Sequence, residues 1–175
     1  MTATPRRIEA LAGSHDRSAF ACGSEALDRY LRQQARQDAE RRVAAPFVLV
    51  APPGRRVLGY FTLSSFTVHI DDLPQALARK LPRYPQLPVT LIGRLAVDRS
   101  LQGQGVGTLL LMDALSRSLA GAEQIAALAV VVDAKDDEAE AFYRRFDFLP
   151  LQHQPRRLFL PMKTVERIFP RNDGG

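Results

Sequence analysis

A glycine-rich stretch in the middle of the chain has the residue types of a phosphate-binding loop. Gly103, Gly105 and Gly107 alternate with other residues, and Gln102 precedes them. Apolar residues recur at helical spacing over 108–119, so a helix follows the loop directly. A helix start exposes unpaired backbone N–H groups at the positive end of the helix dipole. The stretch therefore predicts a cradle for a phosphate group.

Other glycine loops share some of these features. A P-loop ends in Gly-Lys-Ser/Thr, whereas Val-Gly-Thr follows Gly105 here. A dinucleotide fingerprint needs its third glycine one residue later, although Asp133 ends an apolar strand roughly where a ribose-binding acid would fall. A tight turn between a strand and a helix would need no ligand at all. The pattern Gln/Arg-x-x-Gly-x-Gly/Ala is matched by Gln102, Gly105 and Gly107 without adjustment.

A second residue that could do chemistry is Tyr143. It lies in a stretch with acids at 136–140 and arginines at 144–145, an order that complements a helix dipole. A tyrosine hydroxyl can donate a proton to a leaving group, while the same ring could simply pack beside neighbouring phenylalanines. No general base is evident. Asp98 and His69 are candidates, and a structural salt bridge is the alternative for Asp98.

These residues require a frame of alternating strands and helices. The pattern predicts strands at 8–11, 46–51, 57–64, 91–97, 125–132, 148–151 and 157–162, and helices after Ser24 and at 71–80, 108–119 and 136–145. The strand-helix-strand unit around the glycine loop implies a parallel pair with a right-handed crossover. We expect one α/β (α+β) domain over 1–162, with a mixed sheet of six to seven strands flanked by helices, and a flexible tail at 163–175.

Composition limits the cellular context. The chain has 175 residues, of which 46% are hydrophobic, a proportion suited to one domain with a core. No apolar run approaches the roughly 20 residues of a membrane span, and the N-terminus has no apolar signal segment. The single cysteine, Cys22, fits a reducing cytoplasm, and the three histidines are not spaced as metal ligands. We expect a cytoplasmic protein without metal or membrane attachment.

Charge points to an anionic partner. The net charge is +5, and only three of the 24 basic residues are lysine. Arginine forks suit phosphate recognition. The helix after Ser24 carries arginines on its outer faces, which contact a nucleic-acid backbone in one interpretation and solvent in the other, because Asp28, Asp38 and Glu40 reduce the local field. Its basic residues and those that follow it are Arg29, Arg32, Arg36, Arg41 and Arg42.

The glycine loop and the tyrosine helix together resemble a known family. The run from Gln102 to Gly107 is similar to the loop that holds the pyrophosphate of acetyl-coenzyme A in the GNAT superfamily of N-acetyltransferases. The run from Asp136 to Phe148 resembles the superfamily's helix pattern Asn-x-x-Ala-x-x-hydrophobic-Tyr-x-x-x-Gly-Phe. Two positions depart from it: Asp136 stands where Asn is usual, and Asp147 where Gly is usual, so Asp147 must adopt a left-handed turn.

The resemblance implies a GNAT fold with splayed central parallel strands, a catalytic tyrosine and an acetyl-CoA site. Tyr143 matches the tyrosine that gives a proton to the departing thiolate. Main-chain groups around 95–97 would bind the pantetheine arm and the acetyl oxygen. The residues implied in coenzyme binding are Leu95, Ala96, Val97, Gln102, Gly103, Gln104, Gly105, Val106, Gly107, Thr108 and Asp136.

A closer likeness concerns three segments, 20–31, 93–100 and 141–146. They look like the acetyltransferase toxins of bacterial type II toxin–antitoxin modules. Those proteins acetylate the free amine of aminoacyl-tRNA, block translation, dimerise and are neutralised by a ribbon-helix-helix antitoxin. The likeness adds Arg94 to the candidate tRNA-binding residues. The alternatives are an acetyltransferase acting on a small amine or a protein N-terminus, a non-catalytic acyl-CoA- or nucleic-acid-binding module, and, more distantly, a dinucleotide oxidoreductase.

The lack of an evident base is compatible with such a substrate. A lysine side chain, with a pKa of about 10.4, is mostly protonated at neutral pH, whereas an α-amine with a pKa near 8 is partly neutral already. Esterification of the carboxyl group should lower the pKa of an aminoacyl amine further. Positioning alone would then suffice.

Overall fold

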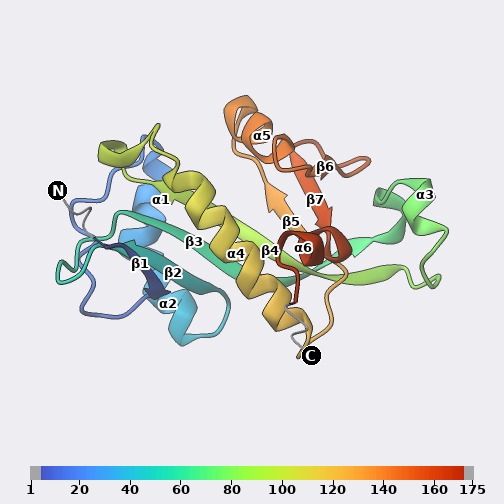
Figure 1. The fold of residues 1–175 in the computed structure, drawn as a ribbon, viewed down its shortest axis with the longest axis horizontal. Helices are drawn as coiled ribbons and strands as arrows, with labels where there is room; N and C mark the ends of the chain where they lie inside the picture. Colours follow the sequence, from blue (N-terminus) through green and yellow to red (C-terminus); the bar gives the residue numbers. More distant parts are fainter. Residues whose placement is uncertain (1–4, 172–175) are drawn as a thin grey trace. The chain divides into compact units, whose positions relative to one another are not determined.

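The computed structural model describes residues 5–171, which divide into two compact units. Unit 1 contains the chain up to Ser64 together with Gly93–Ala114, and unit 2 contains Ser65–Ile92 and the chain from Leu115 onward. Figure 1 identifies the helices and strands of both units. The elements β3, β4 and α4 each pass from one unit into the other.

Hydrogen bonding orders the strands of a seven-stranded sheet as β1-β2-β3-β4-β5-β7-β6. The pairing of β4 with β5 is parallel, whereas β1–β2, β2–β3, β5–β7 and β6–β7 are antiparallel. The expected mixed sheet of six to seven strands flanked by helices is confirmed. The strands are β1 (Arg7–Ala10), β2 (Ala45–Val50), β3 (Gly59–His69), β4 (Gln86–Val97), β5 (Ala129–Asp133), β6 (Leu149–Pro150) and β7 (Arg157–Pro161).

The four predicted helical segments lie close to their expected places, and the structure adds the 3-10 turn η3 (Arg99–Leu101) and α6 (Met162–Ile168). The predicted segments correspond to α1 (Glu25–Arg29), the π-helix η1 (Tyr30–Gln34), α2 (Ala35–Glu40), the 3-10 turn η2 (Ile70–Asp72), α3 (Gln75–Ala78), α4 (Val106–Ala122) and α5 (Asp137–Arg144). Within residues 5–171, none of these helices is long and apolar enough to cross a membrane.

In unit 1, the segment α1–η1–α2 contributes to a core with β2 and β3. Ser24 caps α1 as expected, since its side chain accepts a hydrogen bond from the backbone N–H of Leu27. A regular helix was predicted here, but the structure widens it into a π-helix in which the Ala35 N–H donates to the Tyr30 carbonyl, five residues earlier. The widened turn places both Tyr30 and Ala35 on the buried side.

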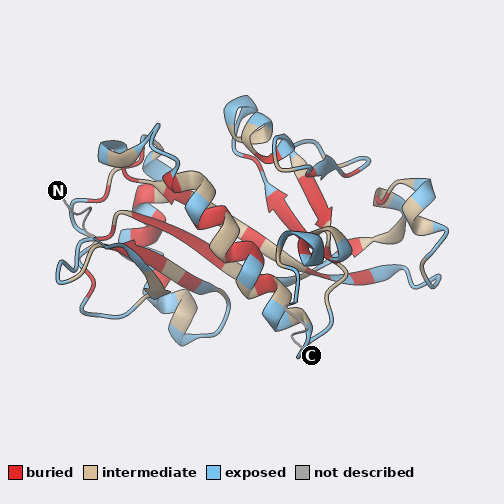
Figure 2. Cartoon of the chain, viewed as in Figure 1, coloured by how far each residue is buried: buried red, intermediate tan, exposed pale blue. Residues whose placement is uncertain are grey.

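In unit 2, β5 is buried on both faces, as a continuous apolar strand in a parallel arrangement should be. It pairs with β4 at Thr90–Ile92 and with β7 along Arg157–Pro161. Figure 2 shows β5 and β7 as buried over most of their length. The connection between these two strands carries α5.

The C-terminal segment differs from the expectation of a flexible tail after residue 162. The structure forms helix α6 over Met162–Ile168, in which Met162 and Val165 are buried. The backbone N–H of Met162 donates to the Leu128 carbonyl at 2.8 Å. Two buried apolar residues spaced by three positions anchor the helix. So short an apolar pattern is hard to distinguish from a polar tail in the sequence. The remainder of the expected tail, 172–175, lies outside the described residues.

Candidate active site

The glycine loop leads directly into helix α4 in unit 1. Gly103 and Gly105 both have a φ of +78°, in the left-handed region that glycine adopts without strain. A Cβ placed on either residue would meet no atom within 4 Å, so backbone conformation rather than crowding requires glycine. Helix α4 begins at Val106, where the first N–H groups have no helical acceptor. The loop thus faces open space beside a row of donors, as a phosphate cradle requires.

Asp98 holds the start of this loop and is a structural residue. Its carboxylate accepts bonds from the backbone N–H of Ala21 (3.0 Å) and from the backbone N–H and hydroxyl of Ser100 (3.1 and 2.6 Å). Arg56 forms a salt bridge with it at 3.2 Å. Burial would raise the pKa of Asp98, but these hydrogen bonds and the Arg56 charge hold that pKa below its usual value. An acid engaged in this way is unsuited to be a general base.

Gln102 fixes the loop through its side chain. Its Nε2 donates to the carbonyls of Cys22 (2.7 Å) and Val97 (3.0 Å). Gln104 similarly donates from Nε2 to the Ser100 carbonyl at 3.3 Å. Both amide side chains therefore hold protein backbone, which leaves the main chain of the loop and the start of α4 as the surface that a phosphate could contact.

The central strand continues past its pairing with β5. Among the described residues, the parallel register of β4 with β5 runs from Thr90 to Ile92, whereas β4 ends only at Val97. The predicted segment Leu95, Ala96 and Val97 belongs to this continuation, within unit 1.

Arg94, on the same strand, lies over an aromatic column formed by Tyr30 and Tyr60. Its guanidinium carbon is 3.5 Å from the centroid of the Tyr30 ring, and Tyr30 stacks on Tyr60 with centroids 6.3 Å apart and an interplanar angle of 18°. The Tyr30 hydroxyl donates to Asp38 at 2.8 Å. Burial and the bond to Asp38 raise the pKa of Tyr30, so this column is neutral apart from Arg94. Within residues 5–171, Arg94 makes no hydrogen bond or salt bridge, although it is half-buried.

In unit 2, helix α5 presents Tyr143. The Asp136 side chain caps this helix by accepting from the backbone N–H of Ala139 at 2.8 Å. Asp147, after the helix, has a φ of 70°, which confirms the left-handed turn expected where an aspartate replaces glycine. The Asp136 carboxylate therefore has a structural partner, in addition to any contact that it makes with a coenzyme.

The Tyr143 ring is buried between two phenylalanines. Its centroid is 5.2 Å from that of Phe142 and 5.6 Å from that of Phe148. Burial, and secondarily the negative charge of Asp133, raise the pKa of Tyr143 above its usual value. Its hydroxyl makes no hydrogen bond with any residue from 5 to 171. Packing thus fixes the ring while the hydroxyl keeps its proton and has it available for donation.

The predicted tRNA-binding arginines of the segment after Ser24 lie in different environments. Arg29 pairs with Glu25 at 3.5 Å, and Arg36 pairs with Glu40 at 3.1 Å. Arg32 instead donates to the Phe20 carbonyl at 2.9 Å. A further arginine that sequence reasoning did not single out, Arg17, lies beside Arg32. Arg41 and Arg42 follow α2 in the turn before β2.

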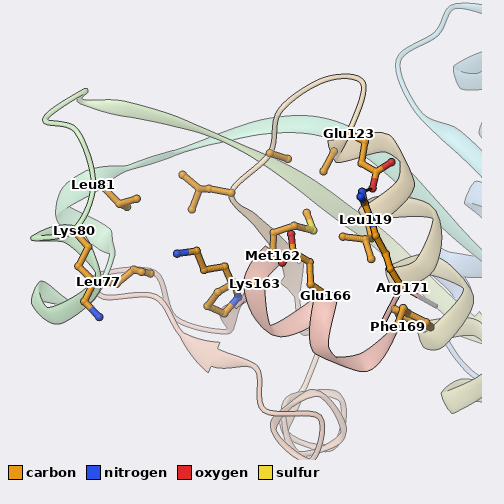
Figure 3. A pocket seen from close by; sticks show the side chains of 14 residues that line it. Leu77, Lys80, Leu81, Leu119, Glu123, Met162, Lys163, Glu166, Phe169 and Arg171 are labelled. Atoms are coloured by element: carbon orange, nitrogen blue, oxygen red, sulfur yellow. Dashed lines mark hydrogen bonds and ion pairs between the residues drawn. The ribbon is translucent and has the colours of Figure 1, made fainter. Parts of the chain in front are cut away.

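Within the described residues, the larger of two cavities lies away from the predicted site residues. In unit 2, a cavity of about 840 Å³ is bordered by the segment around α3, the end of α4 and helix α6 (Figure 3). Leu81, Leu119 and Met162 line it, with Lys163 extending from α6 (Figure 3). None of the predicted coenzyme, tRNA or catalytic residues lines this cavity. Across residues 5–171, no cluster of His, Cys, Asp and Glu could hold a metal ion.

Comparison with known proteins identifies the family. The model of the acetyltransferase (GNAT) family matches residues 9–148. The tRNA-acetylating toxin of Mycobacterium tuberculosis (strain ATCC 25618 / H37Rv) is 38% identical over 165 residues, which cover 94% of this chain and 95% of that protein.

Two solved structures have the same fold over nearly their whole length. AtaT complexed with acetyl-methionyl-tRNAfMet has a TM-score of 0.89 and 32% identity, covering 94% of this chain and 99% of AtaT. A Tyr-to-Phe mutant of the AtaT toxin, bound to the C-terminus of the antitoxin AtaR and to acetyl-CoA, has a TM-score of 0.81 and 29% identity, covering 95% and 99%. The glycine loop, the tyrosine helix and these matches agree: the chain belongs to the acetyltransferase (GNAT) family.

Proposed function

We propose that this protein transfers the acetyl group of acetyl-CoA to the free α-amine of aminoacyl-tRNA, and that it acts as a toxin by removing that tRNA from translation. The observation that carries the proposal is its likeness to a tRNA-acetylating toxin over 94% of the chain. The fold match to a toxin in complex with an acetylated aminoacyl-tRNA supports the same acceptor.

The glycine loop is the proposed site for the coenzyme's pyrophosphate. The N–H groups of residues 103–108 would bind the phosphate oxygens, and the positive φ of Gly103 and Gly105 keeps side chains out of the way. The main chain at Leu95, Ala96 and Val97 would bind the pantetheine arm and hydrogen-bond the acetyl oxygen. The bound coenzyme supplies an acetyl group activated as a thioester. Gln102 and Gln104 hold the loop, and Asp136 holds α5 while contributing to coenzyme binding.

Tyr143 is the proposed general acid. Its raised pKa keeps the hydroxyl protonated at neutral pH, and that proton would pass to the sulfur of the departing thiolate. The hydroxyl has no competing hydrogen-bond partner among residues 5–171. Donation therefore breaks no bond that holds the fold.

The acceptor amine is proposed to arrive neutral. Asp98 is committed to the loop and His69 to its own turn, where its Nδ1 accepts from the backbone N–H of Asp71. An α-amine with a pKa of about 8, lowered further in an aminoacyl ester, needs no strong base near neutral pH. Such an enzyme would select against lysine side chains, whose amines remain protonated.

The tRNA is proposed to contact arginines of unit 1. The salt-bridged arginines must exchange a carboxylate for a phosphate, so they contribute less than those without an acidic partner. Arg94, half-buried and lacking any salt bridge among the described residues, is the strongest member. The proposed set is Arg29, Arg32, Arg36, Arg41, Arg42 and Arg94.

We also propose the partners and setting of the toxin. A homodimer and a ribbon-helix-helix antitoxin follow from the likeness to the toxin family, and a related toxin binds an antitoxin C-terminus. Because aminoacyl-tRNA is used in the cytoplasm, the proposed reaction takes place there. The catalytic domain is proposed to comprise residues 1–162, with the remainder following it.

The test is transfer from labelled acetyl-CoA into total charged tRNA. Label on charged but not on uncharged tRNA, and its loss in Tyr143→Phe, is the expected result, and the labelled species would name the tRNA recognised. If label appears only on small amines or protein N-termini, the acceptor is one of these and not tRNA. Coenzyme binding without any acetylated product would instead identify a non-catalytic module.

A further inference from the structure

Two arginines in unit 1 are oriented by main-chain carbonyls instead of by acids. Arg17 donates from Nη1 to the carbonyls of Leu31 (2.9 Å) and Arg32 (3.3 Å), both in the π-helix η1. Arg32 donates from its own Nη1 to the Phe20 carbonyl at 2.9 Å. Neither arginine forms a salt bridge with any described residue. Their guanidinium groups are thus held in place while their charges stay uncompensated by a carboxylate partner.

Arg17 and Arg32 line one hollow of about 340 Å³, together with His15, Asp16 and Ser18. Ser18 saturates one oxygen of the acid, because its backbone N–H and its hydroxyl both donate to Asp16 Oδ1, at 3.0 and 2.6 Å. The His15 ring is directed elsewhere, with Nε2 2.7 Å from Glu9 Oε1 and Nδ1 accepting from the backbone N–H of Ala12.

The hollow therefore has more donors than acceptors available to a ligand. A guanidinium carries five N–H donors, and each of these arginines has committed only one nitrogen to the backbone. Against two cations stands one ionised acid, Asp16, whose pKa is lowered by the Ser18 hydrogen bonds and by the charge of Arg56. The balance is positive, and a tetrahedral oxyanion matches two guanidinium forks better than a single charge would.

We infer that Arg17 and Arg32 form a preorganised binding site for one backbone phosphate of the RNA acceptor. The inference rests on the proposed function, since it assigns a contact of the same tRNA. It separates Arg32 from Arg29 on the neighbouring helical turn, which already has a carboxylate partner in Glu25. Arg17 and Arg32, unlike Arg29, offer anchored charges without a salt-bridged acid to displace among the described residues.

The test compares Arg32→Gln with Arg29→Gln. Each removes one positive charge from the same helical segment and leaves a polar side chain in its place. The dissociation constant for charged tRNA is measured without acetyl-CoA across a range of salt concentrations. For Arg32→Gln, binding weakens at low salt and the slope of log Kd against log salt falls by about 0.7 to 0.9, the value for one lost phosphate contact. Arg29→Gln changes the slope much less.

Arg17→Gln is the second variant, with thermal unfolding as its control because this residue also holds the π-helix. If it unfolds, Arg32→Gln still decides the question. Equal slopes for Arg32→Gln and Arg29→Gln would overturn the inference, because only overall charge would then matter. A raised KM for acetyl-CoA with unchanged tRNA affinity would also overturn it, because the phosphate would be the coenzyme's. If the wild-type protein acetylates charged tRNA but Arg32→Gln has the same salt dependence as Arg29→Gln, this inference alone is refuted. If the wild-type protein neither binds nor acetylates charged tRNA, the proposed function is refuted as well.

Discussion

The guanidinium carbon of Arg94 lies 3.5 Å above the centroid of the Tyr30 ring, on the strand that leads into the glycine loop. Tyr30 is held in turn by its hydrogen bond to Asp38, so the ring cannot turn away from the cation. A planar guanidinium stacks on such a face in a way that an ammonium cannot. The aromatic column therefore fixes a charge that forms no salt bridge with any described residue.

Replacing Arg94 tests whether that charge serves the acceptor. In Arg94→Gln, the KM for charged tRNA should rise while the KM for acetyl-CoA stays near the wild-type value, because the lost group contacts the RNA. Arg94→Lys should recover only part of the loss, since it keeps the charge without the stack. Steady-state kinetics with each substrate varied in turn provides the measurement. An increase confined to the KM for acetyl-CoA would contradict the assignment.

Removing the Tyr143 hydroxyl should affect turnover without affecting the fold. Tyr143→Phe keeps the ring between Phe142 and Phe148 and breaks no hydrogen bond with a described residue. We expect kcat to fall by about 10²- to 10⁴-fold, the usual range for a lost general acid. The unfolding temperature and the affinity for acetyl-CoA should remain close to wild type. Unchanged kcat would assign the tyrosine to packing alone.

The pH dependence of kcat follows from the same residue. Because the pKa of Tyr143 lies above its normal value of about 10, the hydroxyl stays protonated as the pH rises from 7 to about 9. The rate should therefore show no alkaline loss from this group in that window. The measurement is the single-turnover rate from pH 7 to about 9 with a base-stable aminoacyl analogue as the acceptor. A decline with an apparent pKa under 9 that disappears in Tyr143→Phe would refute the raised pKa.

The glycine loop can be tested with a matched pair of substitutions. Gly105→Ala places a side chain at a φ of +78° and should cost about 1 kcal/mol of strain, with weaker acetyl-CoA binding. Gly121→Ala is the control, because it lies in helix α4, has no positive φ and has no atom within 4 Å of the new methyl group. That change should stabilise the protein by about 0.5 to 1 kcal/mol. Equal effects of the two would exclude the backbone argument.

Asp98 should contribute to stability in a pH-dependent way. Its folded pKa is depressed, so the contribution is complete above the unfolded value of about 3.9 and is lost as the pH falls through the folded pKa. Asp98→Ala should lower the free energy of unfolding at neutral pH by about 2 to 4 kcal/mol, because the Ala21 and Ser100 donors and the Arg56 charge lose their acceptor. Urea unfolding at pH 7 and at acidic pH measures both effects. A difference that does not shrink at low pH would argue against an ionised Asp98.

Local patterns predicted the elements around the site well. Glycine spacing followed by a helical apolar stripe located the loop and α4, and the run of apolar residues located β5, although four residues of the predicted strand, 125–128, form a connection instead. Ser24 could be recognised as a cap because capping acts over only three residues. The left-handed turn at Asp147 was expected on the same local grounds.

The remaining features depend on contacts between distant residues. The Gln102 side chain bonds to a residue 80 positions away, and nothing in its neighbourhood distinguishes this from a ligand contact. Arg17 gave no signal because an arginine in a polar turn has no periodicity, and its role depends on the carbonyls of a π-helix 14 positions away. The π-helix itself preserves a pattern of buried residues that a regular helix would also satisfy.

The anchors of the glycine loop also affect when this protein can become active. Asp98 bonds to a residue 77 positions away and to another 42 positions away, and Gln102 reaches across 80. Closing such long chain segments is slow compared with forming a helix or a hairpin, because their entropy must be lost before the contacts form. The loop therefore takes its shape only when the N-terminal segment has docked against it. Coenzyme binding at the loop thus depends on the folding of unit 1 and not on the loop segment alone.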